Sequence, residues 1–577
     1  MELRLVFRAL RKISDWVVDG YYSETLVEGR DHVPVTGPLI IASTHHNDSI
    51  DVATLAVTIP HRRHLAFWAK STLFNNPIMG SILSSSGAIP VRRNPNVTTT
   101  DPSSSSPSAK VSKEAEVTAR AALFRESSKA LADDQVLGVF PEGTSYTQAS
   151  ILQVMPGAAW AAVEYVRYAR DNGDPSCANI SEKGKEKEAE VSSSLRIVPV
   201  AIVYTDKTRY QSRVSVKYGD PIFVDLYAVE LFVGDQDAAE KAVVKKITTE
   251  VERQLREMTI NAPDWDTICA ISMARSILWD DERNINLKDW VEISQRLVQM
   301  LIDAPELKEA LARYYALLHY SETRHSILLS LLPLSAPLET LPPHAIPASA
   351  ILIQPTIFIL ASFPLSLVRF FLFLPPLLLH FPGYVSGSLI GKLLAVPGEM
   401  ESPAQFKAVG GGLGIAANIA LAFGVLWKKG GLSTLPGFPK VEGVKHVLAL
   451  VGTIYCSVWL LVKWHGLLVN ANYRQLRRII TYRNLFRAFT SPLHRLTTAE
   501  VDVYVKPPLP ALNAYLKKRE ESPVDHKPPK PIAAWKLVRH LLHARTVAVG
   551  ALSEKLKAQN EQTLLGFLES RGAKVPV

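Results

Sequence analysis

The chain has 577 residues, a formal net charge of +9 and hydrophobic residues at 47% of its positions. This length allows a catalytic domain of ordinary size together with a second large region. Three widely spaced cysteines exclude a disulfide framework and a cysteine-based zinc site, which is typical of a protein that faces the cytosol. The N-terminus has a charge every few residues and no apolar core, so a cleavable signal peptide is not expected.

The positive charge is concentrated late in the chain. From Asn470 onward there are 19 Lys and Arg residues against 8 Asp and Glu residues, a net of +11, which leaves about −2 for the rest. Such a basic region indicates an anionic partner, and beside apolar segments the anionic membrane leaflet is favoured over nucleic acid. A tail that is merely solvated is the alternative.

Residues 1–23 are predicted to form an amphipathic helix. Apolar residues recur at helical spacing from Leu3 to Val17, with four basic residues between them. A helix that lies on a membrane surface has this pattern, whereas a spanning helix would be longer and less charged. A helix packed on the following domain is the alternative.

Residues 24–225 alternate strand and helix patterns, which predicts an α/β domain. Two insertions, 94–112 and 171–194, lack the apolar content to fold and are predicted to be disordered surface loops. The predicted strands are 39–42, 88–91, 136–140, 197–204 and 214–217, and the predicted helices are 51–59, 113–133 and 158–170.

A polar stretch, Ser43–Asp51, lies between the first of these strands and a helix. Four residues separate His46 from Asp51. A helix capped by Asp48 or Ser49 would place Asp51 in its first turn, where the carboxylate accepts a hydrogen bond from one nitrogen of the His46 ring. The other ring nitrogen would then be a general base for a hydroxyl group.

Two later stretches place polar groups at the ends of strands. Gly87-Ala88-Ile89-Pro90-Val91-Arg92-Arg93 ends in two arginines, and Phe140-Pro141-Glu142-Gly143-Thr144-Ser145 follows the strand 136–140. A guanidinium group suits a phosphate dianion. A glycine lets backbone amides approach a substrate, and hydroxyl groups donate hydrogen bonds. A solvated arginine pair and a tight strand-to-helix turn are the structural alternatives.

In this order, the stretches resemble the glycerophospholipid acyltransferase (PlsC-like) family. Its pattern consists of His-x4-Asp, Gly-x-Ile-x3-Arg, Phe-Pro-Glu-Gly-Thr and an apolar strand that contains proline, here Val198–Tyr204. Ala69-Lys70-x3-Phe74-x2-Pro77-x2-Gly80 fits a lesser feature between the first two blocks. The long apolar C-terminal half is most similar to fungal glycerol-3-phosphate/dihydroxyacetone-phosphate O-acyltransferases. The resemblance implies a mixed sheet flanked by helices.

The resemblance also implies the reaction: acyl-CoA-dependent acylation of the sn-1 hydroxyl of glycerol 3-phosphate, with dihydroxyacetone phosphate open as a second acceptor. His46 would be the base, and Asp51 would stabilise the imidazolium. No metal or other cofactor is expected, because acyl-CoA is a co-substrate. The expected substrate-binding residues are Arg93, Glu142, Gly143 and Thr144, with Lys70, Arg92 and Ser145 as further candidates.

Two positions depart from the family pattern. His45 stands where many members have asparagine, which leaves open which histidine acts, although only His46 has Asp51 at the family spacing. Ser145 stands where lysophosphatidate acyltransferases often have arginine, which weakens a lysophosphatidate acceptor. A lysophosphatidate or lysophospholipid acyltransferase and a catalytically silent lipid-binding membrane protein are the alternatives. A metal site at His45, His46, Asp48 and Asp51 is disfavoured, because adjacent histidines point apart.

The second half of the chain is predicted to hold three regions. Residues 226–345 have the pattern of a helical extension, residues 346–464 contain membrane segments, and residues 465–577 form a basic cytosolic tail with a helical stretch near 533–570. Up to four segments are long and apolar enough to enter a membrane, and prolines break the second. They are 350–368, 370–394, 409–427 and 446–462.

Lysines lie between the last two segments and arginines follow the last one, and the positive-inside rule would put both clusters in the cytosol. Two full spans that flank the lysines cannot satisfy this, so either the last two segments form a shallow hairpin or the heavier tail cluster dominates. We expect an even number of crossings, because acyl-CoA and the phosphate acceptor are both cytosolic. The expected location is the endoplasmic reticulum membrane, in a multi-pass arrangement with the catalytic domain facing the cytosol. The expected partners besides the substrates are membrane lipids, and no nucleic acid.

Overall fold

The computed structural model describes residues 5–91, 113–172, 194–231, 235–334, 348–396, 398–428, 443–491, 496–511, 529–558 and 562–575. The insertion 94–112, nearly all of 171–194, and both Arg92 and Arg93 lie outside the described residues. The chain divides into two compact units. Unit 1 comprises Met1–Ile260, Val396–Gln405 and Ala511–Ser522, and unit 2 comprises Asn261–Ala395, Phe406–Pro510 and Pro523–Val577.

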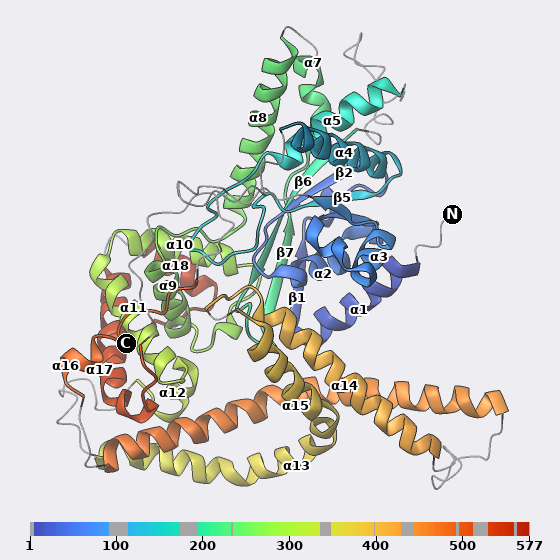
Figure 1. The fold of residues 1–577 in the computed structure, drawn as a ribbon. Coiled ribbons are helices and arrows are strands. Elements are labelled where there is room, and N and C mark those ends of the chain that lie inside the picture. Colours follow the sequence, from blue (N-terminus) through green and yellow to red (C-terminus); the bar gives the residue numbers. More distant parts are fainter. Residues whose placement is uncertain are drawn as a thin grey trace, which may run out of the picture. The chain divides into compact units, whose positions relative to one another are not determined.

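Unit 1 is built on an eight-stranded mixed sheet with the order β1-β7-β6-β2-β5-β3-β4, in which β8 also pairs with β6 (Figure 1). The neighbouring strands β6, β2, β5, β3 and β4 are parallel, so their carboxyl ends lie at one edge of the sheet. β7 and β8 run antiparallel to β6. The predicted α/β class with a mixed sheet is therefore confirmed. The strands are β1 (Glu24–Glu28), β2 (Leu39–Ser43), β3 (Leu65–Lys70), β4 (Ile89–Val91), β5 (Val136–Val139), β6 (Arg196–Tyr204), β7 (Arg213–Tyr218) and β8 (Ile222–Phe223).

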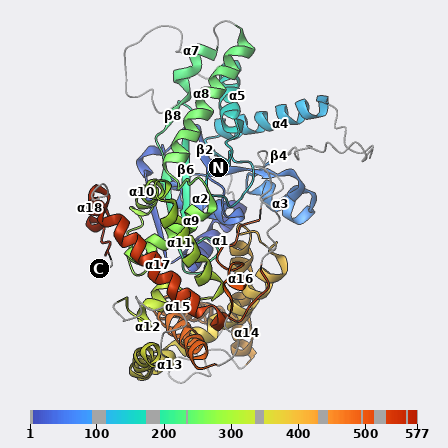
Figure 2. The same ribbon diagram turned by 90° about the vertical axis from the view of Figure 1, so that its left-hand side faces the viewer.

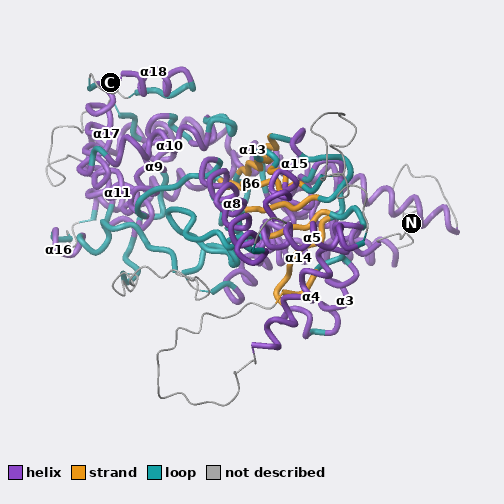
Figure 3. Tube along the Cα trace, turned by 90° about the horizontal axis from the view of Figure 1, so that it is seen from above, coloured by secondary structure: helices purple, strands orange, loops and turns teal. Residues whose placement is uncertain are grey.

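Helices bury the central strands. β2 and β5 are buried at every residue, as expected for parallel strands with both faces covered. Ile40 and Ala42 of β2 share one apolar core with three helices, which lie together against the strands in Figures 2 and 3. These helices are α4 (Lys113–Ala132), α5 (Gly157–Asp171) and α8 (Gln236–Glu257).

The N-terminal helix α1 (Leu5–Tyr21) packs against α2 (Asp48–Thr58). Val18 and Tyr21 are buried, whereas Ile13 and Trp16 are exposed. The helix therefore has one face packed on unit 1, the alternative considered from the sequence, and a second face with apolar side chains in solvent. Two short helices, α3 (Pro77–Ser85) and α7 (Ala228–Leu231), complete the described helices of the sheet region.

The region predicted as a helical extension is helical and divides between the units, with α8 in unit 1 and α9 to α12 in unit 2. Near the C-terminus, α17 packs against α11 and buries Leu541, Ala548 and Leu552. A purely solvated tail is therefore excluded for α17. The bounds are α9 (Trp265–Leu278), α10 (Trp290–Ile302), α11 (Pro305–Tyr320), α12 (His325–Leu331), α16 (Thr498–Val501), α17 (Val538–Lys557) and α18 (Gln562–Ser570).

Unit 2 also contains long apolar helices: α13 (Ala348–Leu394), most of α14 (Pro403–Lys428) and α15 (Gly443–Thr490). Within the described residues, three stretches are long and apolar enough to cross a membrane, namely Ile351–Leu394, Pro403–Lys428 and Val447–Thr490. The first two predicted segments, 350–368 and 370–394, are joined in α13. The last segment continues in α15 to Thr490, inside the predicted tail.

α13 stays helical at Pro382, where one side chain of another helix donates to the carbonyl group that the proline leaves without a helical donor. Proline has no N–H, so it leaves the carbonyl four residues earlier, that of Leu378, without its helical donor. Asn418 of α14 donates from Nδ2 to the carbonyl oxygens of Leu378 at 3.0 Å and Leu379 at 3.1 Å. Neighbouring helices satisfy such groups in membrane proteins, so a proline-rich pattern need not end the helix.

Candidate active site

The parallel strands bring several loops to the same edge of the sheet. The loop with His45 and His46 follows β2, the loop 140–147 follows β5, and Lys207 follows β6. Ligands of open α/β sheets bind outside the carboxyl ends of the strands, so this edge is the candidate active site. β4 reaches the same edge at Val91, directly before Arg92 and Arg93.

Asp51 is fully buried and accepts hydrogen bonds at both carboxylate oxygens. Oδ2 accepts the backbone N–H groups of His46 at 2.8 Å and Asn47 at 2.7 Å, and Oδ1 accepts the hydroxyl of Tyr204 at 2.6 Å. Nδ1 of His45 lies 3.0 Å from Oδ2. Burial alone would raise the pKa of Asp51, but the His45 and Tyr204 contacts outweigh it and the pKa is lowered. Asp51 is therefore a carboxylate at neutral pH.

The ring that contacts Asp51 is that of His45, whereas the spacing had suggested that of His46. The loop curls around the carboxylate through the two consecutive amides of His46 and Asn47, which places the side chain before them against Oδ2. The His45 ring also stacks on Phe140, with centroids 4.1 Å apart. The His46 ring lies edge-on to Tyr146, with centroids 6.1 Å apart.

The start of α2 also differs from the expectation. The N-cap residue is Asn47, not Asp48 or Ser49, and its side chain makes no capping hydrogen bond. Asp48 has φ = 43°, a left-handed value that is uncommon outside glycine. The Asp51 carboxylate satisfies the amides at this helix end, so side-chain capping by Asn47 is not needed.

The third block joins the His45 loop to β5. Glu142 is fully buried, and its Oε1 accepts the backbone N–H of His45 at 2.8 Å. Gly143 has φ = 77°, and a Cβ at this position would lie 1.8 Å from Cε of Met155. The left-handed φ therefore favours glycine at this position, and any side chain would displace the end of Met155. Burial and the neighbouring Glu142 carboxylate raise the pKa of Tyr146.

Three further predicted residues, Thr144, Ser145 and Lys70, lie on these loops or at the same edge. The Thr144 side chain is buried, with Oγ1 3.5 Å from the carbonyl oxygen of Ser145. Ser145 donates its hydroxyl to Oδ1 of Asp48, which joins the first and third blocks. Lys70 is the last residue of β3, which β5 separates from β2 in the sheet.

Sequence reasoning missed Tyr204, Thr147 and Lys207. Lys207 donates from Nζ to the carbonyl oxygen of His46 at 3.1 Å and to the hydroxyl oxygen of Thr147. Burial lowers the pKa of Lys207, and nearby carboxylates only partly oppose this. For Tyr204 and Lys207 the available signal was the fourth block, because β6 is parallel to β2 and its end therefore lies at the same edge. For Thr147 it was the position directly after the third block.

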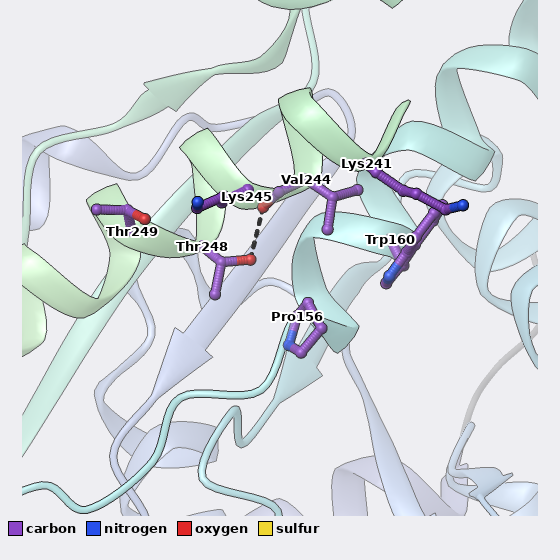
Figure 4. Close-up of a pocket in the computed structure, with 7 residues that line it drawn as sticks. All are labelled: Pro156, Trp160, Lys241, Val244, Lys245, Thr248 and Thr249. Carbon is purple, nitrogen blue, oxygen red and sulfur yellow. Dashed lines mark hydrogen bonds between the residues drawn. The ribbon is translucent and has the colours of Figure 1, made fainter. Parts of the chain in front are cut away.

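A surface hollow of about 350 Å³ lies elsewhere in unit 1, between α5 and α8 (Figure 4). None of the residues that line it belongs to the loops at the sheet edge, so it is not part of the candidate active site. They are Pro156, Trp160, Lys241, Val244, Lys245, Thr248 and Thr249.

A comparison with known proteins finds a family match in the sheet region. The sequence profile of the family described as Acyltransferase matches residues 24–203. This interval contains the parallel strands together with the His45, Asp51 and Glu142 positions. Residues 24–203 are therefore similar to an acyltransferase domain.

Two relatives from Saccharomyces cerevisiae have more specific names. Glycerol-3-phosphate O-acyltransferase 2 is 28% identical over 162 residues, which are 28% of this chain and 18% of that protein. Glycerol-3-phosphate O-acyltransferase 1 is 23% identical over 205 residues, which are 34% of this chain and 24% of that protein. The matches thus span less than a quarter of these relatives' own length.

Among solved structures, the chain is similar to the 1-acyl-sn-glycerophosphate (LPA) acyltransferase PlsC from Thermotoga maritima. The similarity covers 43% of this chain and 78% of that chain, at 15% identity and a TM-score of 0.27.

Proposed function

We propose that this protein transfers the acyl group of acyl-CoA to the sn-1 hydroxyl of glycerol 3-phosphate and so forms lysophosphatidate, the first step of glycerolipid synthesis. The observation that carries the proposal is the 3.0 Å contact of His45 Nδ1 with the Asp51 carboxylate, inside the family-matched residues. The names of the two yeast relatives favour glycerol 3-phosphate as the acceptor. Dihydroxyacetone phosphate, which has the same phosphate and a primary hydroxyl, is the second acceptor proposed.

In the proposed reaction, His45 is the general base. Its Nδ1–H donates to Asp51, which leaves Nε2 to take the proton from the acceptor hydroxyl. The hydroxyl oxygen attacks the thioester carbonyl, a C–O bond forms, and the C–S bond breaks. The imidazolium then returns its proton to the leaving thiolate of CoA. Asp51 stabilises the imidazolium throughout.

The remaining predicted residues are assigned to the acceptor. Arg93 binds the phosphate by a bidentate contact, and Arg92 and Lys70 add positive charge. Gly143, Thr144 and Ser145 stay proposed substrate-binding residues. Glu142 has a further role in this proposal, because its carboxylate holds the backbone of His45 and so the base itself.

We also propose that the protein is a multi-pass protein of the endoplasmic reticulum membrane with unit 1 in the cytosol, where acyl-CoA and glycerol 3-phosphate are found. The apolar helices and the basic C-terminal region support a membrane location, and an even number of crossings is proposed, because it keeps unit 1 and the region after Asn470 on the same side. Protease treatment of sealed microsomes tests the orientation of the region after Asn470. Cleavage without detergent is expected, and protection until detergent is added contradicts the proposed orientation.

The activity test uses the purified full-length protein with palmitoyl-CoA and three acceptors in parallel: glycerol 3-phosphate, dihydroxyacetone phosphate and lysophosphatidate. We expect the highest kcat/KM with glycerol 3-phosphate, and loss of transfer in Asp51→Asn. Transfer to lysophosphatidate alone would identify the protein as a lysophosphatidate acyltransferase instead. Absence of transfer to every acceptor, by protein that elutes as a folded species, would reject the proposal.

A further inference from the structure

The loop between α13 and α14, both labelled in Figure 1, belongs to unit 1, although most of the two helices belongs to unit 2. The loop and the first turn of α14, residues 396–405, are far from the four blocks in sequence, and two of their side chains, Glu401 in the loop and Gln405 in α14, contact the candidate active site. We refer to residues 398–405 as the inter-helix segment.

Glu401 is the first of these residues. Its side chain is 3% exposed, and its Oε1 accepts the hydroxyl of Thr147. Thr147 in turn accepts a hydrogen bond from Lys207, which also donates to the carbonyl oxygen of His46. A series of contacts therefore runs from buried Glu401 through buried Thr147 and half-buried Lys207 to the backbone next to His45.

Gln405 is the second. Its Nε2 donates to Oδ2 of Asp48 at 3.1 Å, and its Oε1 accepts the backbone N–H of Ser49 at 3.3 Å. Ser145 holds the other oxygen of the Asp48 carboxylate. Asp48 has the left-handed φ of 43°, a strained conformation that persists only where the surroundings hold it. Gln405 and Ser145 are such surroundings.

We propose that Glu401 and Gln405 are positioning residues for the acyl transfer, a role that rests on the proposed function. Glu401 acts through Thr147 and Lys207 on the backbone of the histidine loop, and Gln405 acts on the turn that begins α2. Neither residue needs to touch a substrate. The segment between two span-capable helices thereby completes the active site of the sheet unit.

The charges around Lys207 explain why a carboxylate is needed at position 401. The groups that face this ammonium are Glu401 from the inter-helix segment, Asp48 and Asp51 from α2, Glu142 from the loop after β5, and the His46 carbonyl. Burial lowers the pKa of Lys207, and Glu401 is the carboxylate that opposes this most. Without Glu401, the pKa of Lys207 falls further below that of a free lysine.

The sign of the pH effect follows. Lys207 donates as an ammonium below its pKa and loses its charge as the pH rises through it. In the pH profile of kcat, the fall on the alkaline side (the alkaline limb) should therefore move to lower pH when Glu401 is replaced by Gln. A residue that only packs the segment in place would lower activity without moving this limb.

The experiment compares full-length wild type with Glu401→Gln, Glu401→Asp and Gln405→Ala, using palmitoyl-CoA and glycerol 3-phosphate between about pH 6 and pH 10. We expect Glu401→Gln to lower kcat on the order of 10- to 100-fold, the range of a lost positioning contact, with the KM for acyl-CoA nearly unchanged. Glu401→Asp should restore part of the rate and the wild-type limb. Gln405→Ala should lower kcat without moving the limb, because it removes no charge.

Glu399→Gln is the matched control, because it removes the same charge two residues away. The backbone N–H of Glu399 donates to the carbonyl oxygen of Val396. Burial and the nearby carboxylates of Glu401 and Asp48 raise the pKa of the Glu399 side chain. The described hydrogen bonds of Thr147 and Lys207, however, go to Glu401 and the His46 carbonyl and not to Glu399. We expect wild-type kcat and a wild-type pH limb from this variant. Equal shifts in Glu399→Gln and Glu401→Gln would overturn the inference, because they would reflect total charge.

Two further outcomes separate the possible failures. If the wild type transfers no acyl group to any acceptor, the proposed function fails. If the wild type is active and Glu401→Gln keeps its kcat and pH profile, this inference fails alone. Should Glu401→Gln not fold, as judged by its melting curve, Gln405→Ala decides: unchanged kcat in that variant overturns the role of the segment.

Discussion

The sheet of unit 1 and the long helices of unit 2 use polar side chains in opposite ways. At the carboxyl edge of the sheet, His45 and Asp51 from the stretch after β2 meet Glu142 from the loop after β5. Along the long helices, polar groups pair with each other, as in the contacts of Asn418 with Leu378 and of Tyr384 with His465, while apolar side chains face outward. Polar groups that meet at the edge of the sheet can act on a substrate, whereas polar groups that pair between helices hold those helices together. Catalytic residues are therefore expected at the sheet edge.

The largest effect that tests this comparison is expected at Asp51 and its partner ring. Asp51→Asn should lower kcat by about 10³- to 10⁴-fold, because an amide does not stabilise an imidazolium as a carboxylate does. His45→Ala should be similarly severe, and His46→Ala should cost about 10-fold or less. Initial rates with glycerol 3-phosphate measure all three. If His46→Ala abolishes transfer and His45→Ala does not, the base is His46, as the His-x4-Asp spacing suggests, and not His45, whose ring contacts Asp51.

The next effect is expected at Arg93. Arg93→Ala should raise the KM for the phosphate acceptor far more than that for acyl-CoA, because a bidentate contact to a phosphate is lost. Such a contact contributes roughly 2–4 kcal/mol, or on the order of 30- to 1000-fold in kcat/KM. Arg93→Lys should restore only part, since it keeps the charge without the fork. A defect confined to acyl-CoA would place Arg93 on the donor side of the site.

A smaller effect is expected at Gly143. Gly143→Ala puts a methyl group against Met155 at a left-handed φ, which should lower the free energy of unfolding by about 1–3 kcal/mol. The melting temperature should fall by a few degrees, and kcat should fall with it, because Glu142 and the His45 backbone are held by this turn. Ala158, buried at the start of α5, offers a control: Ala158→Gly should lower the melting temperature with less loss of kcat. Equal kcat losses at equal stability would mean that the turn has no special link to the base.

The smallest effect on catalysis is expected in the long helices. Asn418→Ala leaves the Leu378 carbonyl without its donor, which should cost about 1 kcal/mol of helix packing. The melting temperature in detergent should fall slightly, and kcat should stay within about two-fold of wild type. A large loss of kcat with unchanged stability would break the comparison, because it would give the membrane-length helices a part in the chemistry.

The sequence was sufficient for the strands that carry the four blocks, because buried apolar runs followed by polar loops have few alternatives in an α/β chain. It was not sufficient for the side-chain contact that matters most. Whether His45 or His46 meets Asp51 depends on how the loop curls and on the left-handed Asp48, and residue spacing does not encode either.

Other features escaped prediction for a different reason. Glu401 contacts Thr147, just after the third block, and Gln405 contacts Asp48 of the first block, both across more than 250 residues of chain. No local pattern marks such contacts. The prolines of α13 predicted a break, but the helix continues. The sequence near Pro382 does not reveal this, because the compensating donor, Asn418, lies on another helix. In both cases the missing information was a partner distant in sequence.

The length of α13 has a consequence for how the protein meets a bilayer. Its apolar part, Ile351–Leu394, has 44 residues and would extend about 66 Å at 1.5 Å per residue. The hydrocarbon core is about 30 Å thick, and even a helix tilted by 40° needs only about 26 residues to cross it. A single crossing would leave roughly 18 apolar residues, and it would separate the inter-helix segment from Met1–Ile260, with which it forms unit 1. α13 must therefore bend within the membrane instead of crossing it once. Five prolines lie within this helix, and each is a point at which such a bend costs little.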